Sequence, residues 1–298
     1  MSAGSAAGDP LIERSRNQGA GEAVSTPLGF DSAQPAAGPL APGRALRERF
    51  LSGEPTVGTF LGLGSVTAAE ACAAAGLDWV LVDLEHGGGD EDQVGAIVAA
   101  AGAYGTATLV RVEQPERIRI GRALDAGAAG VMFPRISSAA EAAEARRHQL
   151  YPPQGDRGVA SYNRAARWTL DTAALDRANE QTIGIVQIET RGAVDDLEAI
   201  AATPGADVLF VGPQDLSYAL GVPRQFDDPG FQDVLDRVVE ACRRHGKVAG
   251  ILANDRAAIE RYRDRGFGFL AIGSDATLLA SAVSASIPDG LGVDHAAG

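Results

Sequence analysis

Residues 80–89 read VLVDLEHGGG, in which an apolar run leads into charged residues and then three glycines. Its apolar run is typical of a strand that is buried on both faces, as in a parallel sheet. The three glycines that follow let the backbone turn without Cβ strain. Asp83, Glu85 and His86 therefore fall where a buried strand meets its loop. Charged groups cost stability at such a place, so their presence indicates a function.

Two later stretches have the same form. Residues 183–189 read IGIVQIE, and residues 208–215 read VLFVGPQD. Each is an apolar strand with a carboxylate at or just past its carboxyl end. The repetition predicts that several strands present functional groups on one side of the sheet.

Strands and Ala-rich helices alternate along the rest of the chain, and glycines follow many of the expected helix ends. We expect strands at 56–63, 79–83, 107–111, 130–133, 183–188, 208–211, 247–252 and 269–272. We expect helices at 44–52, 67–75, 91–103, 115–124, 138–147, 194–202, 231–245, 256–265 and 276–284. Eight such βα units predict a (β/α)8 TIM barrel. The long irregular stretch 151–168 is typical of a functional loop.

A dinucleotide-binding fold is the main alternative. Gly62-Leu63-Gly64 follows a strand and opens a helix, and Asp83 lies about twenty residues further on. The third glycine of that fingerprint is absent, because Thr67 occupies its place. The partial match therefore favours the barrel over a Rossmann fold.

Composition limits the classes of function. The chain of 298 residues is 45% hydrophobic and 22% charged, which is typical of a globular protein. Its net charge of −13 argues against nucleic-acid binding. No apolar run reaches the roughly 20 residues of a membrane span. The N-terminus also lacks the basic and apolar segments of a signal peptide, so we expect a cytoplasmic protein.

The ends of the chain differ in composition from its middle. Residues 1–43 are rich in Ala, Gly, Ser and Pro, which predicts a disordered tail. The barrel would then occupy residues 44–288, and residues 289–298 would form a flexible C-terminal tail.

Two scarce residue types restrict the chemistry. Cys72 and Cys242 have no metal-type spacing, so we expect both to be small buried hydrophobic residues in a reducing compartment. Lys247 is the only lysine, and it falls at the start of a strand, on the face of a barrel that carries stability. Schiff-base catalysis, which needs a lysine in the pocket, is therefore improbable.

Active sites of such barrels lie at the carboxyl ends of the strands. The polar residues at those ends should converge on one mouth: Asp83, Glu85, His86, Arg111, Gln187, Glu189 and Asp215. Glu189 and Asp215 offer two hard oxygen ligands, which suit Mg²⁺, Mn²⁺ or a similar divalent ion. Arg111 could stabilise charge on an enolate or carboxylate oxygen, and His86 could move protons near neutral pH.

Structural explanations exist for the same residues. His86 could be a hydrogen-bonded loop histidine, Glu189 could pair with Arg191, and Arg111 could bind a neighbouring carboxylate. Their shared position at the strand ends of one face favours the functional interpretation.

Several ordered stretches resemble the class II 2-oxo-acid (pyruvate) aldolases of the HpcH/HpaI family, including 4-hydroxy-2-oxoheptanedioate aldolases. The resemblance runs from about Phe50 to Leu279. It is carried by DLEHG at 83–87, VR at 110–111, LDAGA at 124–128, YPP at 151–153, RGV at 157–159, QIET at 187–190 and GPQDLS at 212–217. It implies a TIM barrel of the phosphoenolpyruvate/pyruvate-domain type.

The resemblance also implies an activity, the cleavage of a 4-hydroxy-2-oxo acid to pyruvate and an aldehyde through a metal-bound enolate. Glu189 and Asp215 would hold a divalent ion (Mg²⁺, Mn²⁺ or Co²⁺), and Arg111 would stabilise the enolate oxygen. Small molecules would be the substrates, and a homo-oligomer is implied, with hexamers known in the family.

Other roles follow from the resemblance in the same way. His86 would transfer protons and would be oriented by Asp125. Gln187 would bond near the metal and the substrate, and backbone N–H groups around Gln214 and Asp215 would receive the pyruvate carboxylate. Asp125 ends a helix that should finish on the far face, so its pairing with His86 would need a subunit contact.

The sequence departs from the family pattern at Arg135, which follows Pro134, and at Gln214 beside the metal ligand. Both could reshape the aldehyde side of the pocket, and Arg135 would suit an acceptor with a second anionic group. Two other functions stay open. One is a malyl- or citryl-coenzyme A type lyase, which would need a basic coenzyme site. The other is a barrel that binds a 2-oxo acid without turnover.

Overall fold

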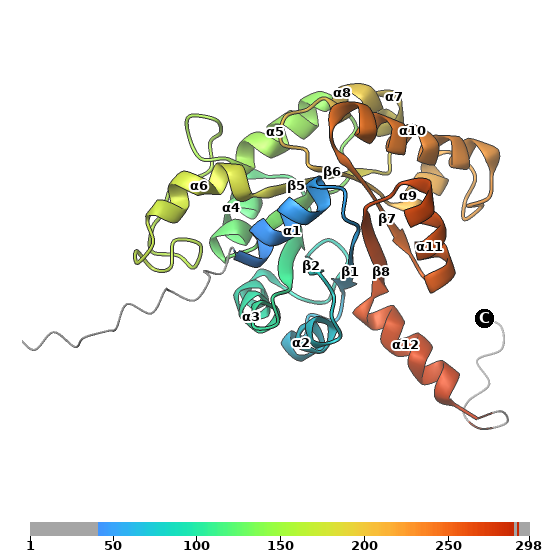
Figure 1. Cartoon of the computed structure of the whole chain (residues 1–298), viewed down its shortest axis with the longest axis horizontal. Helices are drawn as coiled ribbons and strands as arrows, with labels where there is room; N and C mark the ends of the chain where they lie inside the picture. The colour runs from blue at the N-terminus through green and yellow to red at the C-terminus, as the bar shows by residue number, and fades with distance from the viewer. Residues whose placement is uncertain (1–40, 289–290, 292–298) are drawn as a thin grey trace, which may run out of the picture. The chain divides into compact units, whose positions relative to one another are not determined.

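Eight parallel strands close into a barrel in the order in which they occur in the chain (Figure 1). The computed structural model describes residues 41–288 and 291. The strands are β1 (Thr56–Leu61), β2 (Trp79–Asp83), β3 (Ala107–Arg111), β4 (Gly130–Phe133), β5 (Ile183–Ile188), β6 (Val208–Val211), β7 (Val248–Ala253) and β8 (Phe269–Ser274). The predicted TIM barrel is confirmed, and the Rossmann alternative is wrong.

Helices surround the barrel (Figure 1). They are α1 (Ala41–Leu51), α2 (Val66–Ala74), α3 (Glu91–Gly102), α4 (Arg117–Asp125), α5 (Ala139–Gln149), α6 (Ala173–Gln181), α7 (Arg191–Asp195), α8 (Leu197–Ala201), α9 (Pro213–Ala219), α10 (Pro229–His245), α11 (Arg256–Arg265) and α12 (Asp275–Ser286). Most of the expected helices are present within two residues at each end. The sequence prediction missed α6 and α9, and the helix expected at 194–202 is two short helices, α7 and α8.

Aromatic side chains fill the barrel interior. The Trp79 and Phe269 rings stack with their centroids 4.3 Å apart, and Phe210 meets Phe269 edge to face at 6.4 Å. Trp79, Phe210 and Phe269 are at most 1% exposed. Because this packing fills the interior, a substrate site must lie at an end of the barrel rather than inside it.

The glycine-rich segment that resembled a dinucleotide fingerprint has a structural role. The Gly62 N–H donates to Asp275 Oδ1 at 2.7 Å, so the loop after β1 is tied to the start of α12. Gly64 lies at φ 61°, and a Cβ there would stand 2.6 Å from the Gly89 Cα. These glycines therefore allow two loops of the barrel rim to meet.

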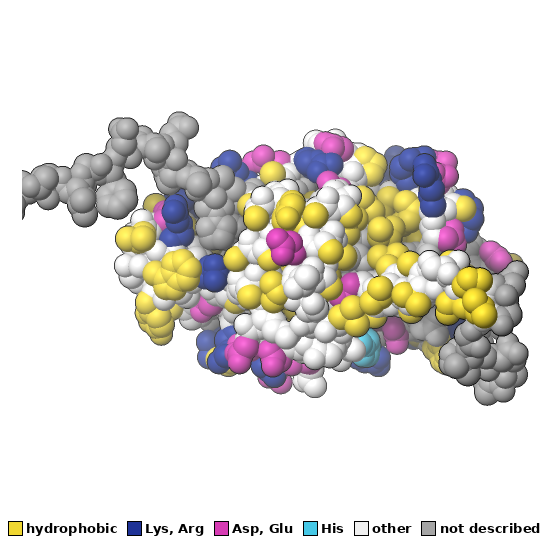
Figure 2. Space-filling view, turned by 90° about the horizontal axis from the view of Figure 1, so that it is seen from below, with side chains coloured by type: hydrophobic (Ala, Val, Ile, Leu, Met, Phe, Trp, Pro, Cys, Tyr) yellow, Lys and Arg dark blue, Asp and Glu magenta, His cyan; other side chains and the backbone are white. Residues whose placement is uncertain are grey.

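The last helix, α12, extends away from the barrel (Figure 1). Every residue from Thr277 to Ser286 is exposed, although Leu278, Leu279 and Val283 are apolar. Hydrophobic side chains run along the projecting arm at the right of Figure 2. The exposed fractions of Leu279 and Val283 are 57% and 54%, so α12 presents an uncovered apolar surface.

Most residues of the two expected terminal tails lie outside the described part of the chain. Residues 1–40, the main part of the expected N-terminal tail, lie outside the described residues, whereas residues 41–43 begin α1. The expected C-terminal tail also lies outside them, apart from Leu291. Among the helices that the structure describes, none is long and apolar enough to cross a membrane. Both cysteines are free thiols; Cys242 is buried, whereas Cys72 is only partly so.

Candidate active site

A cavity of about 900 Å³ opens at the carboxyl ends of the strands. His86, Arg111, Gln187, Gln214 and Asp215 line it, together with residues of α10 and α11. Five of the eight predicted site residues therefore share one cavity. Neither Glu189 nor Arg135 lines it, but Glu189 contacts two residues that do, Gln187 and Gly212.

Arg111 is held by two carboxylates. Its Nε and Nη2 donate to the two oxygens of Asp83, at 2.9 and 2.6 Å, and its Nη1 lies 3.1 Å from Glu85 Oε2. Asp83 and Arg111 are partners in the parallel β2–β3 register, which brings their side chains together. The guanidinium also lies over the Phe60 ring, 5.1 Å from its centroid. Arg111 thus binds neighbouring carboxylates, as the structural explanation proposed, and it also faces the cavity.

The turn after β2 presents His86 to solvent. Asp83 Oδ1 accepts hydrogen bonds from the backbone N–H groups of Glu85 and His86, at 3.1 and 3.2 Å. The turn needs Gly87, because a Cβ there would lie 2.2 Å from the Asp83 carbonyl oxygen. The His86 side chain is 66% exposed, and its Nε2 lies 3.9 Å from Glu85 Oε2. The imidazole is therefore free to meet a substrate.

Glu189 is a buried carboxylate directly after β5. Its Oε1 accepts a hydrogen bond from the backbone N–H of Arg135 at 2.7 Å, and its Oε2 accepts one from Gln187 Nε2 at 2.8 Å. Burial, together with the nearby carboxylates of Asp215 and Glu85, raises the pKa of Glu189 from 4.5 to about 7. Among the described residues Glu189 forms no ion pair with Arg191.

The surroundings of Glu189 fit a divalent cation. Gly212 leaves room, because a Cβ there would lie 2.7 Å from Glu189 Oε2. Gln187 Oε1, a good ligand for a hard cation, is buried without a hydrogen-bond partner. Asp215 is exposed in the first turn of α9 and adds negative charge. No group of three or more His, Cys, Asp or Glu residues in the described chain could hold a metal, so carboxylate, amide and solvent oxygens would have to share the coordination.

Two of the predicted residues lie apart from this centre. Asp125, the last residue of α4, accepts a hydrogen bond at 2.6 Å from Arg157, whose side chain is 3% exposed. The Arg157 guanidinium stacks on Tyr151, 4.4 Å from the ring centroid. Within one chain Asp125 is thus paired with Arg157. Arg135 meets the site through its backbone N–H, and its side chain is exposed.

Lys247 lies at the opposite end of the barrel, just before β7. Its Nζ donates to the Thr203 carbonyl oxygen at 3.2 Å, and burial lowers its pKa. The side chain is therefore part of the face that carries stability, as the sequence predicted.

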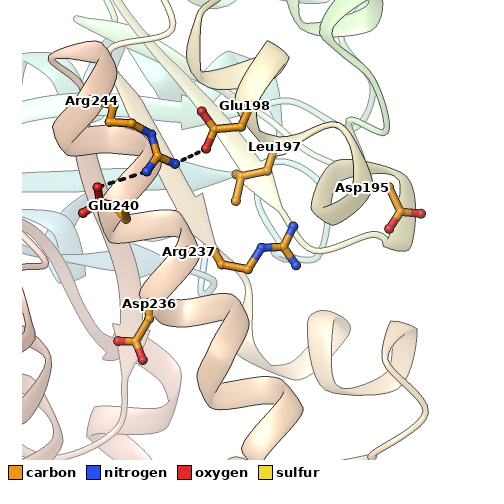
Figure 3. Close-up of a pocket in the computed structure, with 7 residues that line it drawn as sticks. All are labelled: Asp195, Leu197, Glu198, Asp236, Arg237, Glu240 and Arg244. Atoms are coloured by element: carbon orange, nitrogen blue, oxygen red, sulfur yellow. Dashed lines mark hydrogen bonds and ion pairs between the residues drawn. The ribbon is translucent and has the colours of Figure 1, made fainter.

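A smaller pocket, of about 340 Å³, lies on the flank of the barrel between α8 and α10 (Figure 3). Most of its charged groups have partners. Arg244 lies between Glu198 and Glu240 (Figure 3). Asp236 pairs with Arg265, and Arg237 donates to the Val194 carbonyl oxygen at 2.8 Å. Because most of these charges are already satisfied, we assign the pocket no catalytic role.

Sequence reasoning missed part of the site. Gly212 has no functional side chain, so sequence reasoning did not single it out. Its position directly after β6, just before Gln214 and Asp215, is the one signal that could have identified it. The outer wall of the cavity comes from α10 and α11, through Gln232, Arg261, Tyr262 and Arg265. No local motif marks these residues, because they approach the mouth only through the tertiary fold.

The chain is similar to known aldolases over most of its length. It is 42% identical over 236 residues to the hydroxypyruvate/pyruvate aldolase of Paraburkholderia phytofirmans, which covers 77% of this chain and 91% of that one. It is 38% identical over 235 residues to an Escherichia coli 4-hydroxy-2-oxo-heptane-1,7-dioate aldolase, and the match covers 78% of this chain and 90% of that one.

A solved structure and a family model agree with these relatives. The crystal structure of a family protein from Burkholderia cenocepacia superposes with a TM-score of 0.79 at 39% identity, covering 82% of this chain and 97% of that one. The model of the HpcH/HpaI aldolase/citrate lyase family matches residues 56–282. The expected enzyme class, a carbon–carbon lyase, is confirmed. The chain belongs to the HpcH/HpaI aldolase/citrate lyase family.

Proposed function

We propose that the protein cleaves a 4-hydroxy-2-oxo acid reversibly to pyruvate and an aldehyde, with the help of a divalent metal ion. The observation that carries this proposal is the buried carboxylate of Glu189, whose pKa is raised to about 7 beside Asp215 and close to Arg111. A cation would compensate this charge and would at the same time stand next to a fixed guanidinium. That arrangement suits chemistry in which an oxyanion develops.

Glu189 and Asp215 would hold the ion, which could be Mg²⁺, Mn²⁺ or Co²⁺. When bound, it would act as a Lewis acid that polarises the 2-oxo group. Arg111 would stabilise the negative charge that develops on the same oxygen as the C3–C4 bond breaks. Because Asp83 fixes the guanidinium with two bonds, no reorganisation is needed at that moment.

Protons are moved by His86 in this proposal. The imidazole accepts the proton of the 4-hydroxyl group, the C3–C4 electron pair becomes the pyruvate enolate, and the aldehyde forms. The proton then returns to C3 of the enolate to give pyruvate, so the imidazole is restored. Histidine suits both steps, since an imidazole can both accept and donate a proton.

Substrate binding would use both backbone and side chains. The backbone N–H groups of Gln214 and Asp215 stand in the first turn of α9, where helical N–H groups lack partners in the helix. We propose that they receive the pyruvate carboxylate, while Gln187 bonds to substrate near the metal. Gln214 and the exposed Arg135 would shape the aldehyde side, and Arg135 would favour an acceptor that carries a second anionic group.

We also propose that the protein works as a homo-oligomer. α12 has one charged residue, Asp275, and its apolar side chains are exposed from Leu278 onward. A second apolar surface lies on the loop before α6, where Tyr162, Trp168 and Leu170 are 78%, 57% and 85% exposed. Other copies of the chain would cover these surfaces, because burial of apolar area is the main driving force of association.

An oligomer would also give Asp125 a part in catalysis. Within one chain this residue bonds to Arg157. We propose that Asp125 of one copy orients His86 of another, as the family resemblance implies. The site would then be complete only in the assembly, in line with the hexamer expected from the family.

Substrate class can be tested by following pyruvate release from a panel of 4-hydroxy-2-oxo acids, with malyl- and citryl-coenzyme A as comparators. The proposal expects pyruvate from the oxo acids and no turnover of the thioesters. Thioester cleavage without pyruvate release would favour the coenzyme A lyase instead.

A further inference from the structure

Arg135 has a backbone conformation that side chains rarely adopt. Its φ is 54°, in the left-handed region. Five non-glycine residues of the described chain have a positive φ, and Arg135 is the one that follows a barrel strand; the others are Arg167, Trp168, Thr169 and Arg224. Such a conformation costs free energy in a residue with a Cβ, and it persists only where the surroundings enforce it. Contacts at the mouth of the barrel therefore hold the Arg135 backbone in this conformation.

The left-handed turn directs the Arg135 N–H at the Glu189 carboxylate. The donor–acceptor distance to Oε1 is 2.7 Å, at the short end of the range for N–H···O bonds. The other oxygen, Oε2, is left beside Gln187 and Gly212. The N–H thus fixes which edge of the carboxylate turns toward the cavity-lining residues.

The loop after β4 is tied to the loop after β5 by two further hydrogen bonds. Thr190 Oγ1 donates to the Ile136 carbonyl oxygen at 3.0 Å, and it lies 3.1 Å from Ser137 Oγ. Gly192 permits this close approach, because a Cβ there would stand 2.7 Å from the Ser137 carbonyl oxygen. β4 and β5 are hydrogen-bonded neighbours, so the two loops leave the barrel side by side. The ties hold the Arg135 turn against Glu189.

We propose that Arg135 is a positioning residue, whose main-chain N–H rather than its side chain orients Glu189 for cation binding. The inference rests on the proposed function, in which Glu189 is a metal ligand. It assigns Thr190 a supporting part, since its hydroxyl clamps the turn that presents the N–H. Bonds of this kind to a ligating carboxylate typically tune metal affinity.

The test is calorimetric titration of Mn²⁺ into the metal-stripped full-length protein and its variants. Arg135→Gly removes the side chain but accepts a positive φ, whereas Arg135→Val places a β-branched residue where it is strained. Arg167→Val is the matched control, because Arg167 also has a positive φ, 49°, and its N–H bonds to the Arg164 carbonyl oxygen instead. Thr190→Val and Thr190→Ser form a second pair, in which only serine keeps the hydroxyl. Circular dichroism checks that each variant folds.

We expect Arg135→Gly, Arg167→Val and Thr190→Ser to bind Mn²⁺ within about threefold of the wild type. Arg135→Val and Thr190→Val should bind it about tenfold or more weakly, the usual cost of losing a partner of a metal ligand. If Arg135→Val does not fold, the Thr190 pair decides. Wild-type affinity in both Arg135→Val and Thr190→Val, or equal losses in Arg135→Gly and Arg135→Val, would overturn the positioning role but not the proposed metal site. A wild type that does not bind Mn²⁺ would overturn the proposed metal site, and the positioning role with it.

Discussion

Arg111 and Asp83 face each other across the β2–β3 register and are joined by two hydrogen bonds, of 2.9 and 2.6 Å. Both residues are less than 10% exposed. The pair fixes the plane of the guanidinium at the mouth of the barrel. It links the packing of the adjacent strands β2 and β3 to the chemistry that we propose for the site.

Asp83→Asn should reduce kcat/KM for pyruvate formation roughly tenfold to a hundredfold, because a hydrogen bond to a charged group contributes about 1.5–3 kcal/mol. The asparagine amide could accept only one of the two bonds and would turn an NH2 group toward the other Arg111 donor, so the guanidinium would be less well oriented. Steady-state kinetics measure the effect. Asp92→Asn, on the exposed side of α3, serves as the control. Equal kinetics for the two variants would contradict the role of the pair.

Glu189 should make the metal-free protein less stable as the pH rises. Its pKa is about 7 in the folded state against an ordinary value of 4.5, so the folded state retains a proton that the unfolded chain has lost. Stability should therefore fall between pH 4.5 and 7 and level off above pH 7. The shift corresponds to roughly 3 kcal/mol.

Urea unfolding of the EDTA-treated protein from pH 5 to pH 8 measures this effect against Glu189→Gln, which carries no titrating carboxyl group at that position. The variant should lose less stability over the range, and saturating Mn²⁺ should restore stability to the wild type at pH 8. Identical pH profiles for the two proteins would show that Glu189 titrates normally.

Arg135→Met should change the choice of aldehyde. The substitution removes the charge and keeps an unbranched side chain, so the backbone turn that contacts Glu189 should remain. In the aldol addition with pyruvate, an acceptor that carries a carboxylate should lose about threefold to tenfold in kcat/KM, as expected for an exposed charge. A neutral acceptor of equal length should be unaffected. Equal losses for both acceptors would show that the Arg135 side chain does not select an anionic acceptor.

Leu279→Asp should reduce the assembled mass. It places a carboxylate on the apolar surface of α12, where the leucine side chain is 57% exposed. A charge in the centre of an apolar interface is costly, so the variant should form smaller species in light scattering. Leu51→Asp, at the end of α1 where the leucine is 42% exposed, is the matched control. A wild type that is monomeric would contradict the proposed assembly.

The fold could be predicted because the same pattern, an apolar strand followed by a helix, recurs along the chain. Eight apolar runs alternate with helical stretches, and each run is buried as a barrel strand. Of the two missed helices, α9 has only seven residues, and Gly212-Pro213 at its start is typical of a turn. The helix expected at 194–202 is divided at Asp196, whose carboxylate accepts a bond from the Ala139 N–H at 2.7 Å. That contact crosses 57 positions, so no local pattern announces it.

The site could be predicted in part for the same reason. Arg111, Gln187 and Glu189 stand at strand ends, and the barrel rule brings such residues together. The backbone role of Arg135 could not be predicted, because a positive φ is expected at glycine and not at arginine. The pairing of Asp125 with Arg157 also depends on tertiary structure, since 32 positions separate the two residues.

The role of the metal ion can be measured in the reaction itself. Pyruvate formation from a 4-hydroxy-2-oxo acid should be followed in the full-length protein after treatment with EDTA, and again after Mn²⁺, Mg²⁺ or Co²⁺ is added back. We expect that EDTA abolishes turnover, that at least one of these ions restores it, and that Glu189→Gln does not respond to any of them. Undiminished pyruvate formation in EDTA would contradict the account, because Glu189 and Asp215 would then not be essential metal ligands.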